Sequence, residues 1–145
     1  VNLYLWIDWR KHMITDGTNF AKYNNFSSNE FKCKCCGELK ISEIVLDFCQ
    51  AWRTHIQEGV TITSAYRCAE HNSKVSSTGD NGPHTTGFAV DISTSPQLQY
   101  KLIDFALHYD PKPTGLGIAR SFTHLDWLTA DVDQKYVVRP NVWKY

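Results

Sequence analysis

The sequence predicts a small single α+β domain, with a mainly antiparallel sheet flanked by helices. At 145 residues the chain has the length of one ordinary domain, long enough to bury a core. Hydrophobic residues make up 42% and charged residues 21% of the chain, as in globular proteins. Helical and strand patterns then follow one another in the order helix, strand, loop, strand, helix, strand, strand.

The first half of the pattern begins with a helix predicted from Ile41 to Glu58. Apolar residues recur there at helical spacing, and Gly59 supplies the stop. The β-branched alternation of GVTITSAYR, residues 59–67, predicts a strand. Residues 69–83 are polar and contain glycines, which predicts a long loop.

The second half of the pattern begins with FAVDI, residues 88–92, which predicts another strand. Ser95 is the expected N-cap of the next helix, and Pro96 occupies its first position. Residues 115–119 and 122–128 predict a hairpin pair of strands, and residues 136–145 a terminal extended segment.

Composition and charge exclude several classes of partner. The net charge is zero with histidines neutral, so we expect neither nucleic acid nor an anionic membrane as a partner. Charges interrupt the longest apolar runs, so no membrane span is expected. The opening VNLYLWIDWRKHM carries charges where a signal peptide has its apolar region. We expect a monomer without a visible signal peptide.

The five cysteines do not indicate the function: Cys33, Cys35, Cys36, Cys49 and Cys68. Three lie in FKCKCCG, whose spacing is too tight and too incomplete for a four-ligand zinc knuckle. Cys49 lies on the apolar face of a predicted helix, as a buried small hydrophobe. A disulfide from the first cluster to Cys68 is an open alternative. A cysteine hydrolase using Cys68 and His71 lacks an orienting acid.

Two histidines and one aspartate form the candidate metal site: His84, Asp91 and His124. Asp91 lies inside an apolar strand, where its charge is costly unless something compensates it. Alternation along FTHLDW places His124 and Asp126 on one strand face. Two imidazoles and a carboxylate leave a fourth position for water, as in catalytic zinc sites, where the pKa of that water falls from about 16 to about 7. The alternatives are an Asp91 that accepts from a backbone amide and histidines without a metal.

The motifs ITSAYRCAEHN, PHTTGFAVDI and FTHLDW, in this order, resemble the zinc D-alanyl-D-alanine carboxypeptidase and endopeptidase family. This family of peptidoglycan peptidases includes phage endolysins and shares its fold with the hedgehog amino-terminal domain. The residues that match its pattern are Ser64, Tyr66, Arg67, His71, Asn72, His84, Gly87, Ala89, Asp91 and His124. The resemblance implies a zinc peptidase domain over residues 26–145, preceded by a lead-in of unknown role over residues 1–25.

The resemblance also implies roles for individual residues. His84, Asp91 and His124 would bind Zn²⁺. Arg67 would bind a substrate carboxylate or the developing oxyanion, for which a planar guanidinium is well suited, although a surface salt bridge is the alternative. The implied substrate is a stem or cross-bridge peptide of peptidoglycan, cleaved by a carboxypeptidase or an endopeptidase. The implied location is the bacterial cell wall or periplasm, with a phage lysis enzyme as one source.

One departure from the family pattern leaves the general base open. Many members carry an acid three residues before the last histidine, where this chain has Ser121, and others carry a histidine where it has Phe122. Asp126 is our candidate for the base, or else a partner that orients a ligand histidine. Asp80 is a weaker candidate. If no carboxylate serves, the alternative function is a non-catalytic zinc-containing module that binds cell-wall peptide or a protein partner.

Overall fold

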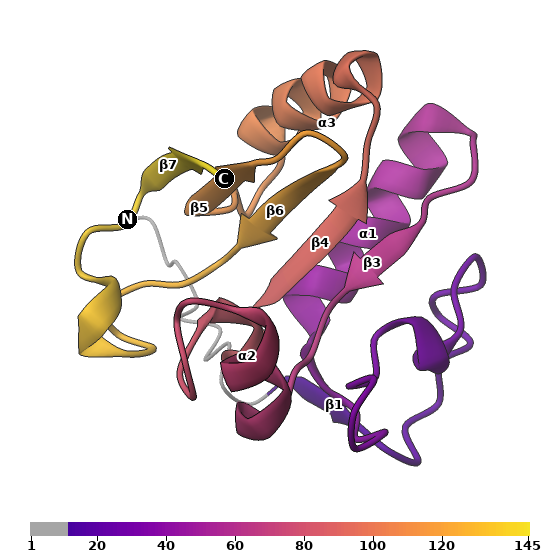
Figure 1. Cartoon of the computed structure of the whole chain (residues 1–145). Coiled ribbons are helices and arrows are strands. Elements are labelled where there is room, and N and C mark those ends of the chain that lie inside the picture. The colour runs from indigo at the N-terminus through magenta and orange to yellow at the C-terminus, as the bar shows by residue number, and fades with distance from the viewer. Residues whose placement is uncertain (1–11) are drawn as a thin grey trace, which may run out of the picture.

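The computed structural model describes residues 12–145, which form a sheet backed by helices (Figure 1). The main sheet has five strands in the order β3-β4-β6-β5-β7, and only the pair β5–β7 is parallel. The predicted α+β class with a mainly antiparallel sheet is therefore confirmed. The predictions made for residues 1–11, part of the lead-in and of the segment tested for a signal peptide, lie outside the described residues.

The helices and strands occupy the following ranges: β1 Met13–Thr15, β2 Lys40–Ser42, α1 Glu43–Ile56, β3 Ile62–Ser64, α2 Ala69–Val75, β4 Ala89–Ser93, α3 Pro96–His108, β5 Gly115–Ile118, β6 Phe122–Asp126 and β7 Asn141–Lys144. The short strands β1 and β2 pair in a separate two-stranded sheet. Among the described helices, none is long and apolar enough to cross a bilayer.

The loop predicted over residues 69–83 is wrong in its first half, which forms helix α2. The Cys68 side chain caps this helix by accepting from the His71 N–H, and Lys74 pairs with Glu70 one turn away at 2.6 Å. Because five of the seven residues of α2 are exposed and its one buried residue, Asn72, is polar, the helix has no apolar stripe from which it could be predicted.

The core lies between one face of the sheet and helices α1 and α3. Phe48 of α1 packs against Phe105 of α3 and against Trp127, with ring centroids 5.6 Å and 5.1 Å apart. Trp52 and Cys49 are fully buried, and the prediction for Cys49 is thereby confirmed. The helices therefore fix β4 and β6 from behind and leave the opposite face of the sheet, the open face, available for a site.

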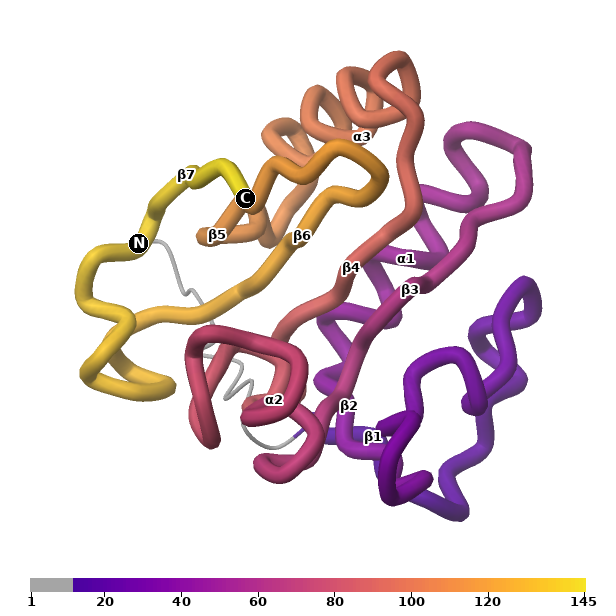
Figure 2. Tube along the Cα trace, in the orientation of Figure 1, coloured from indigo at the N-terminus to yellow at the C-terminus, as the bar shows by residue number. Residues whose placement is uncertain are grey.

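Two segments border the open face. One follows α2, and the other connects β6 to β7 (Figure 2). They meet where the Lys135 ammonium group donates a hydrogen bond to the carbonyl oxygen of Asn81. These segments form the wall of a cleft rather than part of the core.

Candidate metal centre and cleft

One row of residues crosses the open face and contains two of the candidate ligands. The antiparallel register pairs Ser64 with Asp91, Asp91 with His124, and His124 with Gly117. Gly117 is in turn the partner of Trp143 on β7. Since directly paired residues project to the same face of a sheet, Asp91 and His124 lie side by side. Strand pairing alone thus brings together two residues that are 33 positions apart in the sequence.

The third candidate ligand, His84, approaches this row from outside the sheet. It lies in the 3₁₀ turn Pro83–Thr86, and Gly87, at φ 81°, turns the chain from there into β4. The potential ligand atoms of His84, Asp91 and His124 lie within 4.8 Å of one another, and all three residues are buried. The structure therefore brings together the three residues that the sequence analysis singled out.

The proton on His84 decides whether this group suits a cation. Its Nδ1 lies 2.6 Å from the carbonyl oxygen of Ala65, which can only accept, so Nδ1 carries the proton. The buried Nε2 then presents a lone pair 3.1 Å from Oδ1 of Asp91 and makes no hydrogen bond. Burial lowers the pKa of His84, which keeps the ring neutral. Two acceptors that face each other in the interior fit a cation that binds both.

The carboxylate of Asp91 lies between the two histidines and an arginine. Its Oδ1 is 2.9 Å from Nδ1 of His124, and its Oδ2 accepts from the Arg67 guanidinium at 3.2 Å. Burial alone would raise the pKa of Asp91, but the hydrogen bond with His124 and the charge of that ring hold the pKa well below its usual range. Asp91 is therefore an anion, as a zinc ligand must be.

His124 is held from its other side by a second carboxylate. Its Nε2 lies 2.9 Å from Oδ2 of Asp126, a residue with no exposed surface. Arg139 donates to both oxygens of Asp126, from Nε at 3.1 Å and from a terminal nitrogen at 2.9 Å. Burial would raise the pKa of Asp126, but His124 and Arg139 lower it. With Nε2 engaged, Nδ1 of His124 is the nitrogen that faces Asp91 and a cation.

Arg67 is fixed at the edge of the same group by three hydrogen bonds. Besides the bond to Asp91, its Nε donates to the Ser64 hydroxyl at 2.8 Å and another nitrogen to Asn72 Oδ1 at 3.3 Å. Its side chain is 15% exposed. Arg67 therefore belongs to the buried group and is not paired on the surface.

A cleft of about 750 Å³ opens over these residues. Its basic lining residues are Arg67, Lys135, Arg139 and Lys144, and its aromatic ones are Phe122, Tyr136, Trp143 and Tyr145. Among the described residues, Asp91 is the only acid in that lining; Ser121 and Asp80 are exposed and do not belong to it. The charge of the cleft favours an anionic ligand.

Two residues of the centre were not found by the sequence analysis, Arg139 and Trp143. The Arg139 guanidinium lies 4.9 Å from the Trp143 ring centroid, and that ring lies 5.1 Å from the ring of His124. Both come from the terminal segment, which was predicted only as extended chain. The one signal for Arg139 is indirect, because a buried carboxylate such as Asp126 requires a partner.

Comparison with protein families matches residues 24–126 to the family described as Peptidase M15. The matched range covers well over half of the chain, contains Arg67, His84, Asp91 and His124, and ends at Asp126. Comparisons with curated proteins and with solved structures find no match.

Proposed function

This chain belongs to the peptidase M15 family of zinc-dependent metallopeptidases, and we propose that it hydrolyses peptide bonds in the stem or cross-bridge peptides of peptidoglycan. One observation carries the proposal: the unprotonated Nε2 of His84 faces Oδ1 of Asp91 in the interior without a hydrogen bond. This pair, together with His124, provides the donor set of a catalytic zinc site.

The ligands in this proposal are Nε2 of His84, Oδ1 of Asp91 and Nδ1 of His124. Bound there, Zn²⁺ would polarise the carbonyl of the scissile bond and increase the acidity of water. The protein prepares the site beforehand, since the Ala65 carbonyl fixes the tautomer of His84 and Asp126 fixes the orientation of His124.

We propose that Arg67 binds the substrate carboxylate or the oxygen on which charge develops. The bonds to Ser64 and Asn72 hold the guanidinium rigidly beside Asp91. A donor fixed in advance costs no reorganisation during the reaction, which is the condition for electrostatic stabilisation of a transition state.

Of the two roles that the sequence leaves open for Asp126, we propose that it orients His124. Its carboxylate is fully buried, and both oxygens already accept hydrogen bonds from His124 or Arg139. A general base needs a lone pair directed at the reacting water, and these contacts leave Asp126 poorly placed to provide one.

The proposed substrate class follows from the charge of the cleft and from the family motifs. Arg67, Lys135 and Lys144 line the cleft, and peptides of the cell wall carry free carboxylates. We therefore propose a carboxypeptidase or an endopeptidase for wall peptides that acts at the bacterial cell wall, as a bacterial enzyme or as a phage lysis enzyme.

A second candidate function is a zinc-containing module that binds a wall peptide or a protein partner without cleaving it. Two observations favour it. Among the described residues Asp91 is the only acid that lines the cleft, and an exposed Ser121 stands at the position where many family members carry an acid. Such a module would retain the metal and the basic cleft.

The experiment that tests the proposal compares zinc content with hydrolysis. The zinc-loaded chain is incubated with purified cell walls and with a peptide ending in D-Ala-D-Ala, and turbidity and released amines are measured. We expect hydrolysis that a chelator abolishes, that added Zn²⁺ restores and that His84→Ala lacks. Full zinc occupancy without hydrolysis, but with calorimetrically measured peptide binding, would instead establish the binding module.

A further inference from the structure

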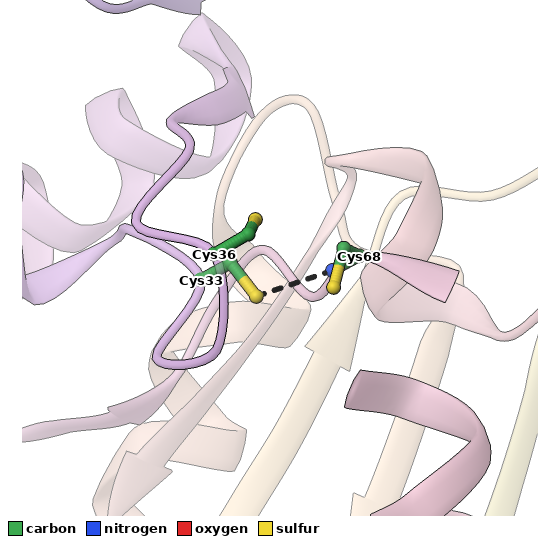
Figure 3. A group of neighbouring side chains, drawn as sticks. All are labelled: Cys33, Cys36 and Cys68. Atoms are coloured by element: carbon green, nitrogen blue, oxygen red, sulfur yellow. Dashed lines mark hydrogen bonds between the residues drawn. The ribbon is translucent and has the colours of Figure 1, made fainter. Parts of the chain in front are cut away.

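A second group of potential metal ligands lies outside the cleft, where the turn after Phe31 approaches the start of α2. The sulfur atoms of Cys33, Cys36 and Cys68 lie within 4.8 Å of one another, and each thiol is free (Figure 3). Figure 3 shows the turn that carries Cys33 and Cys36 beside Cys68, with the Cys33 sulfur directed toward the Cys68 backbone nitrogen; Cys68 comes from a distant part of the chain. The disulfide considered above is not formed.

The sequence spacing of this group is that of a zinc site once both segments are counted. Cys33 and Cys36 form a C-x₂-C pair, and Cys68 and His71 form a C-x₂-H pair. The motif FKCKCCG is incomplete alone, because the two remaining ligands come from the segment that begins α2.

Backbone hydrogen bonds hold the two segments in place. The Cys33 N–H donates to the Glu38 carbonyl at 2.9 Å, and the Gly37 N–H donates to the Cys33 carbonyl at 2.8 Å, with Gly37 at φ 74°. The Cys68 N–H donates to the sulfur of Cys33 at 3.3 Å. The first thiol is thus oriented toward the second segment without any metal.

The distances are close to those that a tetrahedral zinc ion requires. Zn–S bonds of about 2.3 Å and Zn–N bonds of about 2.0 Å place neighbouring sulfurs about 3.8 Å apart, and sulfur and nitrogen about 3.5 Å apart. Nδ1 of His71 lies 3.5 Å from the sulfur of Cys33. The three sulfur atoms, which lie within 4.8 Å of one another, and the His71 ring would have to draw closer together to surround an ion.

The electrostatics of Cys33 agree with this geometry. Burial would raise the pKa of its thiol, but the backbone N–H groups of Cys68, Cys36 and Cys35 and the His71 side chain bring that pKa down to about 6. The thiolate is the form of cysteine that binds metals.

We propose that Cys33, Cys36, Cys68 and His71 bind a second Zn²⁺ in a closed structural site. Four protein ligands leave no position for water or substrate, and binding displaces the protons of the three thiols. The site would fasten the turn at residues 33–37 to residue 68, directly after Arg67. It would thereby support the position of Arg67, and it does not depend on the peptidase activity proposed above.

The test counts zinc and identifies its neighbours in the purified full chain. We expect two zinc ions per chain in the unaltered protein and one in His84→Ala, where X-ray absorption should show sulfur neighbours at about 2.3 Å. Cys68→Ser should also retain one zinc ion, without sulfur neighbours. Cys35→Ser is the matched control, because it removes an exposed thiol of the same turn, and it should retain two zinc ions.

Three results would overturn the proposal. The first is a His84→Ala protein that contains no zinc. The second is a disulfide among the three thiols, found by non-reducing mass spectrometry. The third is a Cys35→Ser protein that loses the sulfur-bound zinc while His71→Ala retains it. Should Cys68→Ser fail to fold, the unaltered protein is treated with a mercurial thiol reagent and released zinc is measured with an indicator. Release of one of two zinc ions is expected, and release of none contradicts the site.

Discussion

Gly115 faces the carboxylate of Asp126 across the β5–β6 pair so closely that no methyl group fits between them. A Cβ atom at Gly115 would lie 2.4 Å from both carboxylate oxygens. The carboxylate cannot swing aside freely, because His124 and Arg139 hold it in the interior. A glycine in a strand is usually a weakness, but Gly115, the first residue of β5, makes room for the residue that orients a ligand.

We therefore expect Gly115→Ala to lower zinc affinity 10–100-fold, as loss of a group that supports a metal ligand does, and hydrolysis at least equally. Overpacking should also cost about 1–3 kcal/mol of stability. Chelator competition and urea unfolding measure the two effects. The control is Gly59→Ala, since nothing lies within 4 Å of a Cβ there. Unchanged zinc affinity in Gly115→Ala would contradict the role of Asp126.

Asp126→Asn separates the two roles considered for this carboxylate. If Asp126 orients His124, the substitution should lower zinc affinity and kcat together, each about 10–100-fold. Arg139→Gln should have the same effect in weaker form, because Arg139 holds the carboxylate. If Asp126 is instead the general base, kcat should fall while zinc affinity remains that of the unaltered chain. This pattern would refute the orienting role. Chelator competition alongside steady-state kinetics measures both.

Arg67→Lys tests whether a fixed guanidinium is required. A lysine provides one nitrogen and cannot maintain the bonds to Ser64, Asn72 and Asp91 at once. We expect kcat/KM for wall peptides to fall more than tenfold while zinc content stays the same. Lys144→Arg, a basic exchange elsewhere in the cleft lining, is the control. A kcat/KM within twofold of that of the unaltered chain would exclude Arg67 from substrate binding.

The fold was predictable from the sequence where one physical pattern dominates. Helix α1 has an apolar stripe that packs on the sheet, and β4 is an apolar strand interrupted by a single aspartate. Helix α2 was missed because its stability comes from caps and contacts with the neighbouring turn, and these leave no periodic signal. The boundaries of β3 were also too wide, since alternation continues beyond the residues that pair.

The metal centre was predictable only in part, for a related reason. Alternation and motif order predict that Asp91 and His124 share a face, and the strand register then aligns them. Arg139 pairs with Asp126, and in the separate cysteine group Cys68 and His71 lie beside Cys33. Tertiary structure alone brings these residues together. No local pattern near FKCKCCG shows that its missing ligands lie beyond β2, α1 and β3.

The hydroxyl group of Tyr136 provides a test in alkaline solution. The residue is 5% exposed, and its oxygen is buried without a hydrogen-bond partner. Burial raises the pKa of Tyr136 to about 12, and the charges of Asp126 and Asp133 add to this effect. An unfolded tyrosine titrates near pH 10. Between these values the unfolded chain releases a proton that the native state keeps, so native stability falls as pH rises.

Tyr136→Phe should therefore reduce the loss of stability between about pH 10 and pH 12. At pH 7 we expect the free energy of unfolding to change by no more than about 1 kcal/mol, in either direction, because no hydrogen bond is lost and an unsatisfied group is removed. Urea unfolding from pH 7 to pH 11 provides the measurement. The control is Tyr100→Phe, at a side chain 78% exposed, which should leave the whole profile unchanged. If the free energy of unfolding of Tyr136→Phe fell with rising pH as steeply as that of the control, the Tyr136 hydroxyl would not be the group that resists ionisation.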